Sequence, residues 1–182
     1  MTLAEIVQAK EEELWTQRIE VGVFYDAMDK VVLEKSAQIG NEYEITFTED
    51  EIAAVKSAHA ILFTHNHPRG WKYALSDPRH AGTSFSPHDL HLACQCRLLE
   101  IHAVSPGYTF CLTASTGAFQ ESDWPAIRFL FDLEYDKVKR EWLALELQGR
   151  QSRLESVANE LHETWTRIAP LLGLVYNRTE EG

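Results

Sequence analysis

The stretch AILFTHNHP, residues 60–68, carries an unbroken apolar run directly into two histidines. A continuous apolar run is typical of a strand that is buried on both faces of a sheet. His65 and His67 lie two residues apart, and in an extended segment such residues point to the same side. Both imidazoles can therefore face one point, and Pro68 stiffens the chain as it leaves the strand.

The segments before this run indicate a helix followed by strands. Residues 3–17 carry apolar side chains at helical spacing, and residues 19–25 are rich in β-branched and aromatic residues. A turn at residues 26–30 and a return strand from Val31 would complete a hairpin. Alternating side chains over residues 43–47 predict a third strand.

The segments after it predict the remaining elements. A capping-box pattern at Thr48 opens a short helix ahead of the apolar run. Residues 69–85 hold glycines, prolines and polar side chains and predict a loop. Strands are expected at residues 101–104 and 108–113, and from Trp124 onward the spacing is helical.

Together these elements predict an α/β fold with a mixed central sheet flanked by helices and a long helical C-terminal extension. We divide the chain into an N-terminal helix, residues 1–18, a metal-binding domain, residues 19–118, and a helical extension, residues 119–182. The apolar positions of the extension can pack on the domain's own core. They can equally form a homodimer or partner contact, and the sequence leaves both interpretations open.

Composition and net charge indicate which classes of molecule the protein is expected to bind. The 182 residues carry a net charge of -11, and an acidic surface repels phosphate backbones, so a protein or peptide partner is expected and nucleic acid is not. No run approaches the ~20 apolar residues of a membrane span. The three cysteines form an odd, sparse set, which favours a reducing compartment, and we expect a cytoplasmic protein.

A third metal ligand has to be brought back by the fold, and Asp89, in the first turn of a helix opened by Ser86 and Pro87, is the candidate. Two histidines and one carboxylate leave a fourth position for water, as in catalytic zinc sites. We therefore predict one Zn2+ per chain, while iron or manganese also accept this donor set. A nearby carboxylate would move the proton of the activated water. Acidic residues are plentiful, and the candidates are Glu20, at the start of the first strand, and Glu34, at the end of the second.

The motif HNHP at residues 65–68, followed by SPHD at residues 86–89, resembles the JAMM signature of the JAB/MPN metallopeptidases, His-x-His-Pro and then Ser-x-x-Asp. The HNHP form is especially similar to the RadC-like branch, and the strand that begins at Glu20 looks like the first core strand of the family. The likeness covers residues 19–113. Residues 48–89 also resemble the C-terminal segments of some phage head-morphogenesis proteins.

This resemblance implies a cytidine-deaminase-like layout, zinc held by His65, His67 and Asp89, and Glu20 as the residue that takes a proton from water. It also implies that Ser86 stabilises the oxyanion of the tetrahedral intermediate. Characterised members of the family hydrolyse peptide or isopeptide bonds, often after a ubiquitin-like C-terminus, whereas others, RadC-like members among them, have no settled activity. The expected substrate is a protein or peptide, with a ubiquitin-like tail as one option.

Several residues have other interpretations. Residues 69–85 make a spacer more than twice as long as the family pattern, which could form a lid or substrate-binding loop, or displace Ser86 and Asp89 from the metal. Ser86 and Asp89 are also a helix-capping signature, which is compatible with a metal site. His88 or His91 could substitute as a ligand. His80 and His102 are expected to be surface or partly buried histidines without ligand roles. Cys94 and Cys96 are a poor zinc pair and are expected to be buried as small hydrophobes.

Three functions follow from these patterns. The first is a zinc-dependent hydrolase of the JAB/MPN type that cleaves a peptide or isopeptide bond. The second is a catalytically silent interaction module, for instance in phage assembly. The third is a metal-dependent nuclease by analogy with the RadC-like branch, which the acidic charge makes the least favoured.

Overall fold

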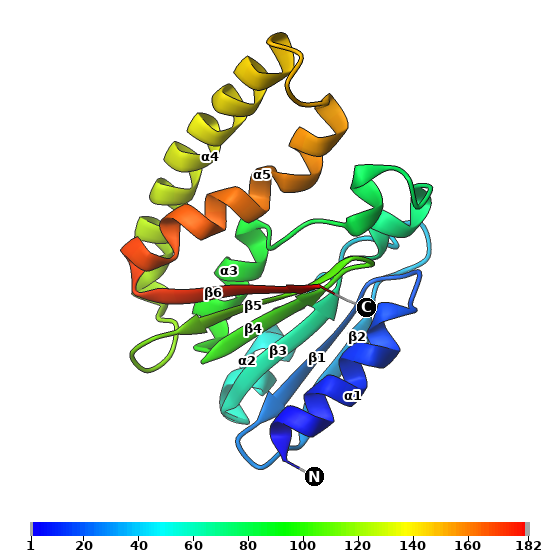
Figure 1. Ribbon diagram of the computed structural model, residues 1–182. Helices are drawn as coiled ribbons and strands as arrows, with labels where there is room; N and C mark the ends of the chain where they lie inside the picture. The colour runs from blue at the N-terminus through cyan, green and yellow to red at the C-terminus, as the bar shows by residue number, and fades with distance from the viewer. Residues whose placement is uncertain (1, 181–182) are drawn as a thin grey trace.

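The computed structural model describes residues 2–180, which form one mixed sheet with helices on both faces (Figure 1). The strand order is β2-β1-β3-β4-β5-β6, and β3 and β4 are the parallel pair among otherwise antiparallel neighbours. The predicted α/β class, with a mixed sheet and flanking helices, is confirmed. The elements are α1 Leu3–Trp15, β1 Val21–Asp26, β2 Val31–Ser36, α2 Glu49–Ser57, β3 Ala60–Asn66, η1 Pro68–Lys72, η2 Pro78–Ala81, α3 Pro87–Cys96, β4 Glu100–Val104, β5 Tyr108–Ala114, η3 Glu121–Asp123, α4 Trp124–Leu147, α5 Arg153–Ile168, η4 Pro170–Leu172 and β6 Leu174–Glu180.

Successive side chains of the central strands point to opposite faces of the sheet and pack in two separate cores. Phe24 and Phe63 stack with ring centroids 4.4 Å apart in the larger core, which also holds residues of α2 and α3. Their neighbours Val23 and Leu62 point the other way and pack with Val7 of α1. In Figure 1 α1 accordingly covers one face of the sheet and α2 and α3 the opposite face. No helix within residues 2–180 has the length and apolar content needed to cross a membrane.

The parallel pairing of β3 with β4 determines where a site can form. A parallel pair needs a crossover connection, and residues 67–99, which include α3, supply it. The C-terminal end of β3 and the N-terminus of α3 therefore lie at one end of the sheet. Polar groups at the carboxyl ends of parallel strands commonly line ligand sites in α/β folds.

The segment 43–47, expected as a strand, is not one. Both edges of β1 are already paired, with β2 and β3, so no ladder there is open to it. Its alternation has another cause. Tyr43, Ile45 and Phe47 are partly buried whereas Glu44 and Thr46 are exposed, because the segment lies with one side on the domain and the other in solvent. The Phe47 ring packs edge-on to Phe24 at 5.4 Å.

The C-terminal extension was expected to be helical, and its last strand corrects that expectation. Helices α4 and α5 form a hairpin that rises beyond the sheet (Figure 1). Gly173, with φ 66, then reverses the chain in the left-handed region that favours glycine. Strand β6 follows and pairs antiparallel with β5, extending the sheet at its edge.

The hairpin is joined to the core through Trp165 of α5. This residue is fully buried, its ring lies 5.2 Å from that of Phe131 in α4, and its Nε1 donates a hydrogen bond to the Phe85 carbonyl at 2.8 Å. Phe85 directly precedes the residue that caps α3. The extension is therefore part of the structure that holds the start of α3.

Trp165→Phe is expected to lower the free energy of unfolding by about 2–4 kcal/mol, because it leaves a buried carbonyl without its donor and opens a void in the core. Chemical denaturation monitored by circular dichroism measures the change. Trp142→Phe is the matched control, since its Nε1 also donates a hydrogen bond, to Glu163, but the indole is only partly buried. Equal losses in the two variants would contradict this role for Trp165.

Candidate metal centre

His65, His67 and Asp89 come together at the end of β3 and the first turn of α3. The two Nε2 atoms lie 2.9 Å apart, and Asp89 Oδ1 and Oδ2 lie 3.4 Å from His65 Nε2 and 3.8 Å from His67 Nε2. One ligand atom of each residue falls within 4.8 Å of the others. His65 is fully buried and the other two are partly buried. The structure thus brings together the three residues that the sequence singled out.

Second contacts orient these three side chains. His67 Nδ1 donates to the Thr83 carbonyl at 2.8 Å, which leaves Nε2 as the bare nitrogen. The Ser86 backbone N–H donates to Asp89 Oδ2 at 2.6 Å, and the Phe63 ring stacks on His65 with centroids 4.9 Å apart. Metal-binding histidines characteristically donate their other N–H to a carbonyl or carboxylate in this way.

The charges of the cluster fit a cation. Although burial raises the pKa of Asp89, the charge of His65 and its hydrogen bond hold that pKa well below its usual range. Burial lowers the pKa of His65, but Asp89 more than offsets this and raises it, whereas burial and the neighbouring His65 lower the pKa of His67. Two imidazole nitrogens and a carboxylate are therefore brought together at one point, and this N, N, O donor set suits zinc.

Glu20 is held beside the centre by its backbone and by Asn66. The Asn66 side chain, 2% exposed, accepts a hydrogen bond from the Val21 N–H at 2.7 Å and donates one to the Ile19 carbonyl at 3.0 Å. Asn66 is the middle residue of the His-Asn-His triplet, so β3 and the residue directly after it carry both histidines and the clamp on Glu20. Sequence reasoning missed this role, for which a buried amide between two histidines was the signal.

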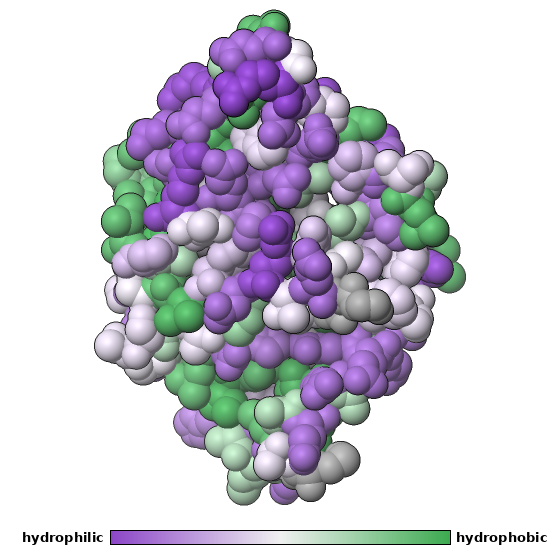
Figure 2. All heavy atoms as spheres, in the orientation of Figure 1, coloured by the Kyte–Doolittle hydropathy of each residue, from purple (hydrophilic) through white to green (hydrophobic). Residues whose placement is uncertain are grey.

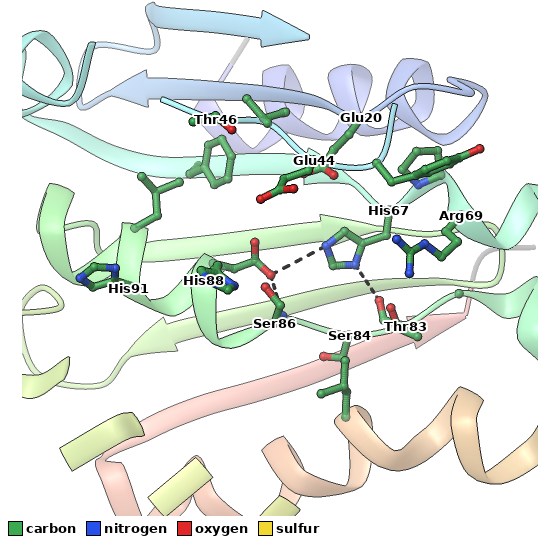
Figure 3. Close-up of a pocket in the computed structure, with 18 of the residues that line it drawn as sticks. Glu20, Glu44, Thr46, His67, Arg69, Thr83, Ser84, Ser86, His88 and His91 are labelled. Atoms are coloured by element: carbon green, nitrogen blue, oxygen red, sulfur yellow. Dashed lines mark hydrogen bonds and ion pairs between the residues drawn. The ribbon is translucent and has the colours of Figure 1, made fainter. Parts of the chain in front are cut away.

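The environment of Glu20 changes its acidity. Burial, with smaller contributions from Asp89 and Glu44, raises the pKa of Glu20 to about 7, while His65 and Arg69 act in the opposite direction. A carboxyl group that titrates near neutrality can both accept and donate a proton at physiological pH. Figure 3 shows Glu20 and Glu44 on one side of the His67 ring, with Ser86 and Thr83 on the other.

The other candidates named from the sequence lie elsewhere. Glu34 pairs with Lys10 of α1 at 3.0 Å, on the α1 side of the sheet. His88 is exposed, and His91 stacks on Trp124 with ring centroids 4.7 Å apart. Neither histidine belongs to either of the two groups of candidate metal ligands found within residues 2–180. Cys94 and Cys96 are buried, as expected from the sequence. This burial raises the thiol pKa to about 12 for Cys94 and to about 11 for Cys96.

The long spacer 69–85 packs against the domain and leaves Asp89 beside the histidines. Trp71 donates from Nε1 to the Trp15 carbonyl at 3.2 Å, and the Arg18 guanidinium lies 3.8 Å from the centre of a Trp71 ring. The spacer also supplies Thr83, the acceptor for His67. Displacement of the two downstream residues, one of the outcomes considered from the sequence, does not occur.

The extension supports the end of this spacer. The hydroxyls of Ser84 and Tyr176 lie 2.8 Å apart, and His162 Nδ1 lies 2.9 Å from the same Tyr176 hydroxyl. Strand β6 and helix α5 thus hold residues that stand only a few positions before Ser86. This long-range support was not foreseen from the sequence.

The centre opens into a cavity of about 1080 Å³. Its walls include the extended segment 43–47, the spacer and the α5 residues Glu160 and Leu161, and both Glu20 and Ser86 line it. Such a volume lies at the upper end of the range for ligand pockets. The centre is therefore accessible to a substrate larger than a single amino acid.

Comparison of the chain with models of known protein families finds no match, and comparison with curated proteins also finds none. The chemistry of the centre is therefore argued from its own residues.

Removing the Glu20 carboxylate is expected to stabilise the metal-free protein at alkaline pH. Because burial raises the pKa of Glu20 from 4.5 to about 7, the native state binds more protons than the unfolded state between these values. Stability is then lost as the pH rises through this window. We expect Glu20→Gln to raise the free energy of unfolding by about 2 kcal/mol at pH 8 and by much less at pH 5.

Denaturation of chelator-treated protein at the two pH values measures this difference. Glu44→Gln is the matched control, because Glu44 is exposed on the same side of the cavity, and we expect it to change stability by less than ~0.5 kcal/mol. A Glu20→Gln effect that is the same at both pH values would contradict the assignment of a buried, proton-binding carboxyl group.

Proposed function

We propose that the protein is a zinc-dependent hydrolase of the JAB/MPN type that cleaves a peptide or isopeptide bond. The observation that carries this proposal is the convergence of two imidazole rings and a carboxylate beside Glu20, whose pKa of about 7 suits proton transfer. His65, His67 and Asp89 would hold the ion. When bound, zinc would supply Lewis-acid activation of a water molecule and of the scissile carbonyl.

The other groups of the cavity have separate roles in this proposal. Glu20 accepts a proton from the attacking water and returns it to the leaving amine, which requires a pKa near the working pH. Asn66 is a positioning residue that holds Glu20 directly before the start of β1. Ser86, at the N-terminus of α3, lines the cavity and stabilises the negative charge that develops on the carbonyl oxygen.

The proposed substrate is an extended peptide tail, of which a ubiquitin-like C-terminus is one example. The cavity is long enough to extend from segment 43–47 to α5, and its walls mix aromatic and aliphatic side chains with charged ones. A peptide presents the same alternation of apolar side chains and polar backbone. The net charge of -11 argues against a polyphosphate chain as the substrate.

A homodimer or partner contact through the extension also remains part of the proposal. The outer face of α4 exposes apolar side chains at helical spacing, and hydrophobic surface gathers over the lower part of this helix at the left edge of Figure 2. The residues and their exposures are Phe129 67%, Leu133 46%, Leu143 49% and Leu147 81%.

The second candidate function is a catalytically silent interaction module of the same fold. Such a module has no requirement for a carboxyl group in the partly buried position that Glu20 occupies beside the metal ligands, and a desolvated acid is costly to keep. The position of Glu20 in the same cavity as His67 and Asp89 therefore favours the hydrolase. A nuclease is disfavoured by the acidic charge.

The test is hydrolysis by the zinc-loaded protein of a panel of extended peptides and isopeptide-linked conjugates. We expect Glu20→Gln to retain zinc but lose about 10²–10⁴-fold in rate, and His67→Ala to lose activity together with the zinc bound at this centre. Glu44→Gln, the matched carboxylate of the same cavity, should stay within about 10-fold of the original rate. A zinc-loaded protein that cleaves no member of the panel, or a Glu20→Gln variant as active as the original, would overturn the hydrolase in favour of the silent module.

A further inference from the structure

We propose that Glu100, His102 and Cys111 form a second metal site, for a zinc-class divalent cation, on the face of the sheet that α1 covers. The site is separate from the centre at His65 and does not rest on the proposed hydrolase function. Its ligands come from the β4–β5 hairpin, and Glu11 of α1 orients the histidine.

The strand register places the three donors together. His102 and Cys111 are direct partners in the antiparallel pairing of β4 with β5, and directly opposed residues have Cβ atoms about 4.5–5.5 Å apart. Glu100 lies two residues before His102 and so projects from the same face of β4. One ligand atom from each residue lies within 4.8 Å of the others.

Thiolate, imidazole and carboxylate together are a zinc-type donor set. His102 Nε2 and Cys111 Sγ approach the same Glu100 oxygen, Oε1, at 2.7 Å and 2.8 Å. Zinc bonds of about 2.0–2.3 Å place the ligand atoms of a tetrahedron roughly 3.4–3.7 Å apart. A rotation of the Glu100 side chain, which is 32% exposed, would supply that adjustment.

The independent observation is the contact of His102 with α1. His102 Nδ1 lies 2.5 Å from Glu11 Oε1, and that oxygen also accepts a hydrogen bond from the Thr64 hydroxyl at 3.1 Å. A carboxylate on the second nitrogen fixes the tautomer of a metal-binding histidine and directs its other nitrogen at the ion. Here the directed nitrogen is Nε2, the atom that faces Glu100 and Cys111.

The competing arrangement is an ion pair without metal, in which a protonated His102 bridges Glu11 and Glu100. That arrangement explains the two carboxylates. In that arrangement Cys111 only donates its S–H to the same Glu100 oxygen and lies 3.5 Å from the Thr113 hydroxyl. With the metal in place all three donors have one partner, and Glu11 ties α1 to the sheet through the ligand histidine.

The two centres lie on opposite faces of the same sheet. Thr64 pairs with His102 across β3 and β4, whereas the next pair along is His65 with Ala103, a residue of the larger core. Each centre can therefore be removed by substitution without touching a ligand of the other. This separation makes the second site measurable by itself.

The test uses cobalt as the probe, because cobalt bound to a thiolate gives a near-ultraviolet charge-transfer band that nitrogen and oxygen ligands do not give. In the His67→Ala variant, which disables the first centre, we expect one cobalt per chain with this band. Adding Cys111→Ser should abolish the band and lower cobalt affinity at least about 10-fold, as loss of a ligand or its support does. His102→Gln should also lower the affinity.

Cys96→Ser is the matched control, since Cys96 is buried in α3 on the opposite face of the sheet and should leave the band unchanged. Circular dichroism of each variant checks that the sheet is retained. The site is overturned if His67→Ala binds no cobalt, if its spectrum lacks the thiolate band, or if the band survives in Cys111→Ser. Loss of the second site would leave the hydrolysis test of the first centre unaffected, so the two proposals fail separately.

Discussion

The hydrogen-bonded register of β3 is the constraint on which both centres depend. This strand is paired on both sides, with His65 opposite Gly22 of β1 and Ala103 of β4. A slip of one residue would turn every side chain to the other face, and burial of the apolar residues of β3 in two separate cores opposes such a slip. The same alternation therefore fixes His65 toward α3 and Thr64 toward α1.

The third candidate ligand and the groups that orient the site come from later parts of the chain. Asp89 reaches the histidines because the crossover from β3 to β4 begins α3 at the same end of the sheet. Thr83 orients His67, and the residues that follow it are held by Tyr176 and Trp165 of the extension. The spacer and extension thus serve the geometry of the centre. An α-helical hairpin that only projected into solvent would have no such contacts.

Local signals made much of the fold and of the first centre predictable. The apolar run of β3, the His-x-His spacing and the helix that begins at Pro87 each depend on neighbours within a few residues. The Asn66 clamp, the strand β6 and the pairing of His102 with Cys111 depend on contacts between distant segments, which periodicity does not report. Segment 43–47 shows the converse error, because one-sided burial gave it the alternation of a strand without a partner strand.

The proposed function depends on the binding of a metal ion by His65, His67 and Asp89. The most direct measurement is anomalous diffraction at the zinc absorption edge from crystals of the zinc-supplemented protein. We expect a peak within about 2.0–2.2 Å of His65 Nε2, His67 Nε2 and an Asp89 carboxylate oxygen. An ordered site in which these three side chains surround no anomalous peak would contradict it.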